Sequence, residues 1–350
     1  RGCGNRTRAK TRFTGTAGRP RGLWGFFLNI LIIEVFMALY LVTGGAGFIG
    51  SNIVEALVEK GEEVRVLDNF STGRRDNLTS FMDKIELFEG DVRSYHIVHE
   101  AVNGVDYILH QAALPSVPRS VKDPVTTNEV NVNGTLNILN AAKDAGVKRV
   151  VFASSSSVYG DLDVLPKTED MLPKPLSPYA VSKLAGEKYC QVFTQMYGLE
   201  TVCLRYFNVF GPRQDPTSQY SAVIPKFITM IKNDKPPTIY GDGEQSRDFT
   251  FVENVVQANL LACGNCAEDL SGEVFNIACG KRVTVNKLVE SVNEIMGTSV
   301  KPQYAEPRIG DVKHSLANIR RAQQILTYEP SCQFNEGIKL TIEFNERKIW

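Results

Sequence analysis

Tyr179 and Lys183 lie one helical turn apart in the segment SPYAVSK, at residues 177–183. Side chains four residues apart face the same side of a helix. Ser177 is a suitable N-cap and Pro178 a suitable first residue, so we expect a helix to begin here. A phenol has a reference pKa of about 10, and an ammonium group about 5 Å away favours its ionisation by on the order of 3 kcal/mol. We therefore expect Lys183 to lower the pKa of Tyr179 and to make its oxygen a proton acceptor.

A run of four serines precedes this pair, in the segment SSSSVYG at residues 154–160. The run follows Val150–Ala153, an apolar stretch typical of a buried strand. Serine hydroxyls at the end of such a strand can hydrogen-bond a reacting oxygen. A tyrosine and a lysine on a solvent-exposed helix are the alternative interpretation, which the serine run makes less attractive.

Short apolar runs alternate with amphipathic runs from residue 39 onward, a pattern typical of a parallel sheet with helices on both faces. Ser51–Lys60 and Thr135–Ala145 have helical periodicity, and Gly146 is a suitable end for the second. We predict an α/β fold, a Rossmann-like doubly wound parallel sheet with a smaller α/β substrate-binding lobe at the C-terminal end. The predicted strands are Leu39–Thr43, Val64–Leu67, Ile85–Phe88, Tyr107–His110, Val150–Ala153 and Thr201–Leu204.

Three glycines, at positions 44, 47 and 50, follow the first predicted strand in the segment TGGAGFIG. Gly44 permits a tight turn, Gly47 lets backbone N–H groups approach a pyrophosphate, and Gly50 lets the following helix pack against the sheet. The helix N-terminus adds partial positive charge. Asp68 ends the second strand, where a carboxylate binds the ribose hydroxyls and repels a 2′-phosphate. The sequence therefore predicts a site for NAD rather than NADP.

The composition excludes several classes of partner. Lys+Arg and Asp+Glu both number 39 among 350 residues, so the formal net charge is +0. No overall field attracts nucleic acid or an anionic membrane, and we expect neither as a partner. The 7 cysteines include one pair with ligand spacing, in CGNC at residues 263–266, but no second pair completes a metal site. We expect free thiols, no metal and a cytoplasmic location.

The first 36 residues differ from the rest of the chain. A basic, Gly-rich stretch precedes GLWGFFLNILIIEVF, an apolar run that is too short to span a bilayer and contains Glu34. This order also resembles a signal peptide. Because Met37 directly precedes the first strand, we interpret residues 1–37 as a poorly ordered extension.

The chain from residue 38 to the C-terminus resembles the extended short-chain dehydrogenase/reductase family, in its nucleotide-sugar epimerase branch. Beyond the segments above, the resemblance is carried by HQAA at 110–113, NVNGT at 131–135, RYFNVFGPRQDP at 205–216 and SRDF at 246–249. The pattern is most similar to bacterial UDP-N-acetylglucosamine 4-epimerases and UDP-glucose 4-epimerases. It implies an NAD-binding domain at 38–207, joined by a late strand near 274–278, and a mainly UDP-sugar-binding domain at 208–350.

The resemblance implies the roles of the reactive side chains. Tyr179 takes a proton from the sugar 4-hydroxyl while a hydride passes from C4 to NAD, and Lys183 lowers the pKa of the phenol and holds the nicotinamide ribose. Ser155 hydrogen-bonds the sugar O4, with Ser156 as a second candidate. The 4-keto sugar then turns over and takes the hydride back on its other face, which regenerates NAD.

The resemblance also implies the ligand contacts and a homodimer formed through helices near residues 126–145 and 179–197. Arg247 and Arg308 suit the two phosphate groups, since each guanidinium can bind a pair of oxygens. The expected NAD contacts are Gly44, Gly47, Phe48, Ile49, Gly50, Asp68, Asn69, Asp91, Val92, Ala112, Ala113, Asn131, Tyr179, Lys183 and Tyr206. The expected UDP-sugar contacts are Ser116, Ser155, Ser156, Tyr179, Asn208, Gln214, Ala222, Tyr240, Arg247, Arg308, Asp311 and Ser315.

Small side chains near the implied sugar site favour an N-acetylated substrate. Ser315 stands where a tyrosine favours plain glucose, and Gln214 and Ala222 match positions around the N-acetyl group. Pro115 departs from the pattern, because these enzymes often have glycine there. We predict interconversion of UDP-N-acetylglucosamine (UDP-GlcNAc) and UDP-N-acetylgalactosamine (UDP-GalNAc), with UDP-glucose and UDP-galactose also accepted.

Two alternatives remain at this point, and a third, the 4,6-dehydratase, is disfavoured. A UDP-glucuronate 4-epimerase differs mainly in how it holds C6, and other nucleotide-sugar-modifying members of the family are related. A 4,6-dehydratase needs an acid pair where this chain has Ser156 and Ser157. An NAD-binding regulator without activity is the last, and the intact Tyr179 and Lys183 argue against it.

Overall fold

The structure is a computed structural model that describes residues 37–216, 223–265, 267, 270–307 and 313–347. The extension predicted for residues 1–37 lies outside the described residues except for Met37. Three predicted substrate contacts, Ala222, Arg308 and Asp311, also lie outside them. The chain from Ala38 onward forms one compact unit.

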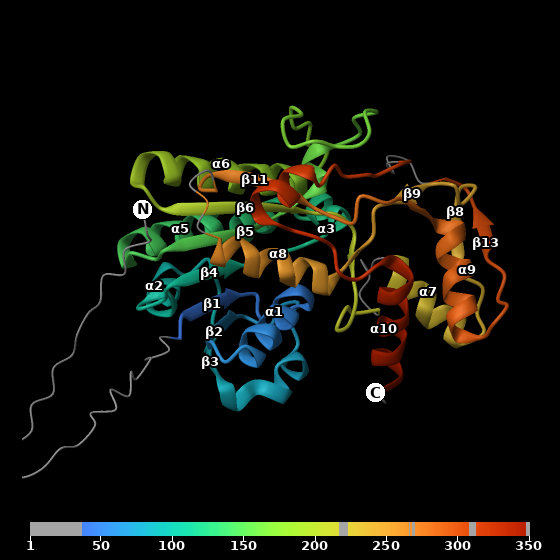
Figure 1. Ribbon diagram of the computed structural model, residues 1–350, viewed down its shortest axis with the longest axis horizontal. Helices are drawn as coiled ribbons and strands as arrows, with labels where there is room; N and C mark the ends of the chain where they lie inside the picture. Colours follow the sequence, from blue (N-terminus) through green and yellow to red (C-terminus); the bar gives the residue numbers. More distant parts are fainter. Residues whose placement is uncertain (1–36, 217–222, 266, 268–269, 308–312, 348–350) are drawn as a thin grey trace, which may run out of the picture. The chain divides into compact units, whose positions relative to one another are not determined.

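A seven-stranded parallel sheet forms the larger part of this unit (Figure 1). All six predicted strands are present, and the Rossmann-like fold is confirmed. The strand order reverses between β1 and β4, and ligands of such sheets bind at that point, outside the carboxyl ends of the strands. In spatial order the strands are β11 (Glu273–Ile277), β6 (Glu200–Tyr206), β5 (Arg149–Ser155), β4 (Tyr107–His110), β1 (Leu39–Thr43), β2 (Glu63–Asp68) and β3 (Ile85–Glu89).

Helices cover both faces of the sheet (Figure 1). Successive residues of a strand point to opposite faces, so Val42 enters one apolar core and its neighbour Leu41 enters the other. One face is covered by α1 (Phe48–Glu59) and α8 (Val252–Gly264), and the other by α2 (Tyr95–Val102), α5 (Gly134–Ala145) and α6 (Pro178–Tyr197).

Of two helices that flank the site, α6 begins where the sequence predicts and α1 begins earlier. The Ser177 hydroxyl accepts a hydrogen bond from the Ala180 N–H (3.2 Å) at the start of α6, as expected for an N-cap. Helix α1 begins at Phe48, earlier than the predicted Ser51. The reason is that the glycine turn leads directly into the helix, with the Ser51 N–H donating to Gly47 O (3.0 Å).

A smaller lobe with its own apolar core follows β6. Phe210, Ile228, Leu288 and Ile338 are among its buried side chains. Its helices are α7 (Val223–Lys232), α9 (Val285–Met296) and α10 (Phe334–Arg347). Its short strands are β7 (Val209–Phe210), β8 (Thr238–Tyr240), β9 (Ser246–Arg247), β10 (Thr250–Phe251), β12 (Val283–Thr284) and β13 (Gln303–Ala305).

Two short helices, α3 (Val117–Lys122) and α4 (Pro124–Asn128), connect β4 to α5.

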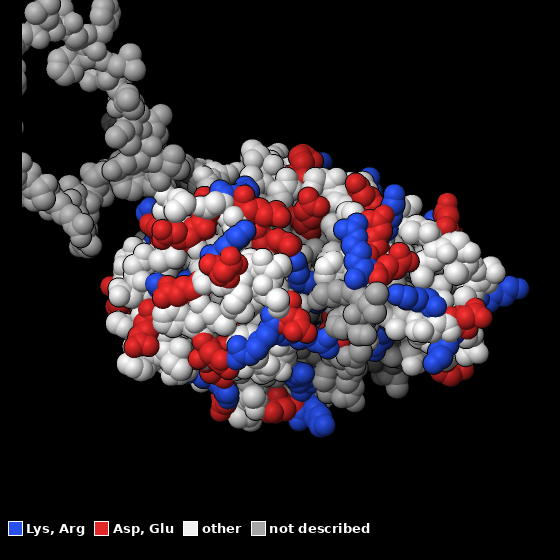
Figure 2. All heavy atoms as spheres, turned by 90° about the horizontal axis from the view of Figure 1, so that it is seen from below, with Lys and Arg blue, Asp and Glu red and all other residues white. Residues whose placement is uncertain are grey.

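On the face that Figure 2 shows, acidic and basic side chains are interspersed. No helix within the described ranges is both long and apolar enough to cross a membrane.

Candidate functional site

The glycine turn between β1 and α1 has no room for side chains. Gly44 has a φ of +68°, and a Cβ there would lie 2.8 Å from the backbone of Ala112. A Cβ on Gly50 would lie 2.1 Å from the carbonyl oxygen of Gly44. The turn therefore holds β1, the loop after β4 and the first turn of α1 in close contact, as a pyrophosphate-binding turn requires.

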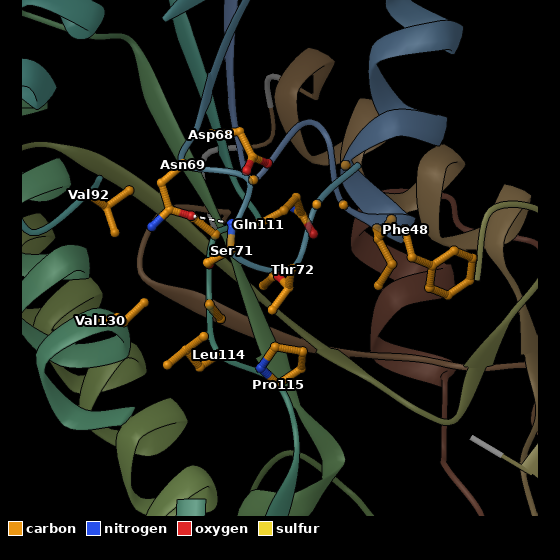
Figure 3. A pocket seen from close by; sticks show the side chains of 18 of the residues that line it. Phe48, Asp68, Asn69, Ser71, Thr72, Val92, Gln111, Leu114, Pro115 and Val130 are labelled. Carbon is orange, nitrogen blue, oxygen red and sulfur yellow. Dashed lines mark hydrogen bonds between the residues drawn. The ribbon is translucent and has the colours of Figure 1, made fainter. Parts of the chain in front are cut away.

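A cavity of about 670 Å³ opens beside this turn, at the carboxyl ends of the sheet strands. Every predicted NAD contact except Asn131 lines it. In Figure 3, Asp68 and Asn69 lie at one end of the cavity, with Val92 and Val130 on one side and Phe48 on the other. The elements that bring these residues together are far apart in the sequence but adjacent in the sheet.

Asp68 lies at the carboxyl end of β2 with 7% of its surface exposed. Its two carboxylate oxygens accept hydrogen bonds from the Ala46 N–H (2.9 Å) and the Phe70 N–H (2.7 Å). Burial raises the pKa of Asp68, and these two hydrogen bonds act against that rise. The carboxylate is thus held in one orientation, and each oxygen keeps a lone pair for a ligand hydroxyl.

Asp91 and Asn131 shape the cavity in different ways. Asp91 accepts hydrogen bonds from Arg93 (2.8 Å) and Asn69 (2.8 Å), and its hydrogen bonds with Arg93 lower its pKa to about 2. Asn131 is buried and does not line the cavity. Its amide oxygen accepts from the Leu114 N–H (2.8 Å) and its NH2 donates to Ser182 (3.0 Å), so it fixes the loop after β4 against α6.

Lys183 lines the cavity, although only 4% of its surface is exposed. Its Nζ donates to the carbonyl oxygen of Ala153 (2.8 Å) and lies 6.0 Å from the centre of the Tyr179 ring. Burial lowers the pKa of Lys183 to about 8. The hydrogen bond joins helix α6 to the end of β5, the strand that leads into the serine run.

The pKa of the Tyr179 phenol lies above its ordinary value in the protein. Burial raises the pKa of its phenol, and hydrogen bonding to Ser155 acts in the opposite direction. In the protein alone, burial thus outweighs the interactions that lower this pKa, and the lowering expected from Lys183 stays a prediction.

The serine run crosses the end of β5, with Ser155 as the last residue of the strand and Ser156 the next, and both are half-buried. The Ser155 hydroxyl accepts a hydrogen bond from the Ser157 hydroxyl (2.8 Å) and interacts with the Tyr179 phenol. This contact with Tyr179 favours Ser155 over Ser156 as the reactive serine, although neither lines the 670 Å³ cavity.

A second cavity, of about 270 Å³, lies in the smaller lobe. Three predicted substrate contacts line it: Asn208, Tyr240 and Arg247. Asn208 stands two residues after Tyr206, which lines the first cavity, so the two cavities approach each other just beyond β6. Arg247 donates to the carbonyl oxygens of Ser246 (3.0 Å) and Lys313 (3.1 Å).

Three more predicted substrate contacts have distinct positions. Ser116 lines the first cavity with a φ of +120°, a backbone conformation that favours glycine. Gln214 also lines it, and its Oε1 is buried without a hydrogen-bond partner in the part of the chain that the structure describes. Ser315 lines neither cavity; its N–H donates to Ser246 O (3.0 Å) beside the second one.

Several residues that are not among the predicted NAD contacts also line the first cavity. Arg74, in the loop after β2, forms an ion pair with Asp215 (2.9 Å), from the loop after β7. The small residues of STG at positions 71–73 were the available signal for the first loop. The other such residues include Ser71, Thr72, Gln111, Leu114 and Arg119.

Comparison with known proteins adds a second line of observation. A sequence model of the NAD dependent epimerase/dehydratase family matches residues 40–278. A putative UDP-glucose 4-epimerase of Methanocaldococcus jannaschii is 39% identical over 309 residues, which cover 87% of this chain and 98% of that protein.

Solved structures have the same fold. The UDP-N-acetylglucosamine 4-epimerase from Methanobrevibacter ruminantium, in complex with UDP-N-acetylmuramic acid, has a TM-score of 0.85 at 40% identity over 89% of this chain and 99% of that one. The Thermus thermophilus UDP-glucose 4-epimerase, in complex with NAD, has a TM-score of 0.79 at 38% identity over 89% and 100% of the two chains.

Proposed function

The chain belongs to the NAD dependent epimerase/dehydratase family, and from this premise we propose that it inverts the configuration at C4 of a UDP-hexose. The observation that carries the proposal is the position of Tyr179. Its phenol contacts Ser155, and its ring lines the same cavity as the glycine turn and Asp68. The proposed proton acceptor, Tyr179, thus lines the same cavity as the proposed dinucleotide site.

The residues of the first cavity fit NAD. The turn at Gly44 and Gly50 lets a pyrophosphate approach the N-terminus of α1, and the fixed carboxylate of Asp68 suits ribose hydroxyls and disfavours a 2′-phosphate. When bound, NAD supplies the hydride acceptor and donor, and its positive ring adds to the charge of Lys183 near the phenol.

The protein's own groups then handle the proton and the sugar. Tyr179 takes the proton from the sugar 4-hydroxyl as C4 is oxidised, and returns it to O4 after the ketone has turned over. Ser155, which contacts the phenol, hydrogen-bonds the same O4. Lys183 holds α6 against β5 and keeps positive charge close to Tyr179.

The UDP group is assigned to the second cavity. Arg247 suits a diphosphate oxygen pair, and Tyr240 offers an aromatic face to a uracil ring. Arg308 and Asp311 are proposed from the family pattern to complete this contact. Because the cavities approach each other beyond β6, the hexose would extend from the second towards Tyr179.

The substrate we favour is UDP-GlcNAc, with UDP-GalNAc as product. Gln214 supports it, because this residue lines the first cavity and its amide side chain is of the type that hydrogen-bonds an acetamido group. Ser116 is also small and lines the same cavity. UDP-glucose lacks the N–H but is no larger, so we expect it to be accepted more weakly.

Coupled assays with UDP-GlcNAc, UDP-glucose and UDP-glucuronate test the proposal, together with mass spectrometry of the small molecules released from the purified protein. We expect bound NAD and the highest kcat/KM with UDP-GlcNAc. Activity on UDP-glucose alone would contradict the acetyl preference, and activity on UDP-glucuronate alone would favour the uronate epimerase.

Gln214→Leu sharpens the assay, because it keeps the apolar bulk and removes the acceptor. The kcat/KM for UDP-GlcNAc should fall about tenfold, the cost of one hydrogen bond to a buried group, while that for UDP-glucose changes little. An equal fall for both substrates would show that Gln214 does not recognise the acetamido group.

A further inference from the structure

A buried ion pair lies directly behind the reactive residues. Glu187 on α6 and Arg205 on β6 are 1% and 3% exposed. The guanidinium binds both carboxylate oxygens, with Nε donating to Oε1 (2.8 Å) and a terminal nitrogen donating to Oε2 (2.8 Å). The Ser154 hydroxyl donates to the same Oε1 (2.5 Å). The three side chains form one charged network inside the fold.

The network continues a regular set of contacts between α6 and the end of β5. Tyr179, Lys183 and Glu187 recur every four residues and share one face of the helix. Each contacts a different residue of β5: Tyr179 meets Ser155, Lys183 donates to Ala153 O, and Glu187 accepts from Ser154. Three turns of α6 thus contact the last three residues of the strand.

Arg205 extends the network to the next strand. It is the register partner of Ser154 between β5 and β6, so both residues approach Glu187 from neighbouring strands. The Arg205 guanidinium also lies 4.7 Å from the centre of the Tyr159 ring, in the serine-run segment beyond Ser155. One carboxylate therefore joins the helix that carries Tyr179 to both strands whose ends form the site.

Stability alone does not explain this arrangement. The loss of hydration on burying two charges often exceeds their mutual attraction, and apolar side chains of similar size fill such a place at least as well. An ion pair with a fixed fork geometry does define positions more sharply than apolar packing. Its location beside Ser155 indicates that the position being defined is that of the reactive serine.

We propose that Glu187, held by Arg205, is a positioning residue: it binds Ser154 and so fixes the backbone from which Ser155 meets Tyr179. This inference rests on the proposed function. Glu187 contacts neither ligand cavity, so it acts on turnover through Ser154 and not through binding of the UDP group.

Ser154→Ala is the sharpest test, measured by steady-state kinetics on the enzyme with its bound NAD. Arg205 still satisfies Glu187 Oε1 in this variant, so no charge is left unpaired and the melting temperature should stay near that of the wild type. We expect kcat to fall about tenfold with KM changed less than twofold, since only the reacting step needs the alignment.

Glu187→Gln is the second variant, and Glu200→Gln is its control. Glu200 pairs with Arg149 (2.6 Å) across the same two strands, β5 and β6, at their opposite ends. Glu187→Gln should lower both kcat and the melting temperature, whereas Glu200→Gln should lower at most the melting temperature. If Glu187→Gln does not fold, Ser154→Ala decides.

A kcat within twofold of the wild type for Ser154→Ala, or a fall in the melting temperature of Glu187→Gln without a fall in kcat per folded molecule, would overturn the positioning role. An inactive wild type would instead count against the proposed function. The two failures are therefore distinguishable.

Discussion

At the scale of single residues, the pairing of Tyr179 with Lys183 was predictable because helical periodicity alone places them on one face. The pKa shifts of the two side chains were not predictable from the sequence. They depend on burial and on the Ala153 carbonyl, which reaches Lys183 from a strand 30 residues earlier. Ser154 likewise gave no sign in the sequence that it, among four adjacent serines, would bind Glu187.

Tyr179→Phe removes the proposed proton acceptor and keeps the ring. We expect kcat to fall by about a thousandfold, in the range of lost acid–base catalysis. Bound NAD should remain, as mass spectrometry of the purified variant would show. Tyr189→Phe, on the same helix but away from both cavities, is the matched control and should keep its activity. A fully active Tyr179→Phe enzyme would refute the assignment.

The burial of Lys183 determines the direction in which the free energy of unfolding changes with pH. The folded-state pKa of Lys183, about 8, lies below the ordinary value of 10.5, so the unfolded chain binds more protons between these values. The contribution of Lys183 to the unfolding free energy therefore rises with pH across this window, by on the order of 3 kcal/mol. At lower pH the folded state carries the cost of a buried charge.

Denaturant unfolding of NAD-free protein from pH 7 to 10.5 measures this effect as the difference between wild type and Lys183→Met. The wild type should gain stability relative to the variant as pH rises. Lys188→Met, exposed on the same helix, serves as the control. A flat difference would show that Lys183 is hydrated in solution.

At the scale of elements, the strands and helices of the sheet were predictable because each has a long, periodic apolar pattern. The smaller lobe was predicted but its individual strands were not, because β7, β9, β10 and β12 are two residues long and are defined by tertiary pairing. The approach of α6 to β5 also escaped prediction. It depends on Gly186, where a Cβ would lie 2.4 Å from the Phe152 ring.

Gly186→Ala should push α6 away from β5, because the Phe152 ring is 1% exposed and has no space to move into. We expect a loss of about 1–3 kcal/mol in the free energy of unfolding, typical of overpacking, together with a lower kcat. Gly264→Ala, at the end of α8, is the control, because among the described residues no atom outside the helix backbone and the adjacent residues lies within 4 Å of the added Cβ. Denaturant unfolding and turnover would be measured on both variants. Equal stability of the two would show that α6 can shift freely.

At the scale of the whole molecule, exposed apolar side chains gather on α3, α4 and α6. Val121, Val125, Val181 and Met196 are 64%, 67%, 53% and 73% exposed. A groove of about 750 Å³ that includes Val125 and Val181 lies between α4 and the start of α6. We propose that a second copy of the chain covers this surface, as the family pattern implies.

Val181→Glu should therefore shift the protein from dimer to monomer in size-exclusion chromatography with light scattering, because a charge would be buried at the interface. Leu340→Glu, on the exposed side of α10, is the control for an added charge elsewhere. A wild type that is monomeric at micromolar concentration, or a dimer that survives Val181→Glu, would contradict this interface.

The sheet also constrains how such a chain can be cut or recombined. Its edge strand β11 (Glu273–Ile277) pairs with β6, yet the first elements of the smaller lobe come between them in the sequence. A fragment ending after β6 would expose an unpaired strand of buried residues to other chains. During synthesis the sheet cannot be completed until β11 has been translated. Much of the smaller lobe is therefore synthesised before the seven-stranded sheet is complete. A new specificity is accordingly easier to reach by altering residues within one lobe than by exchanging lobes at a single junction.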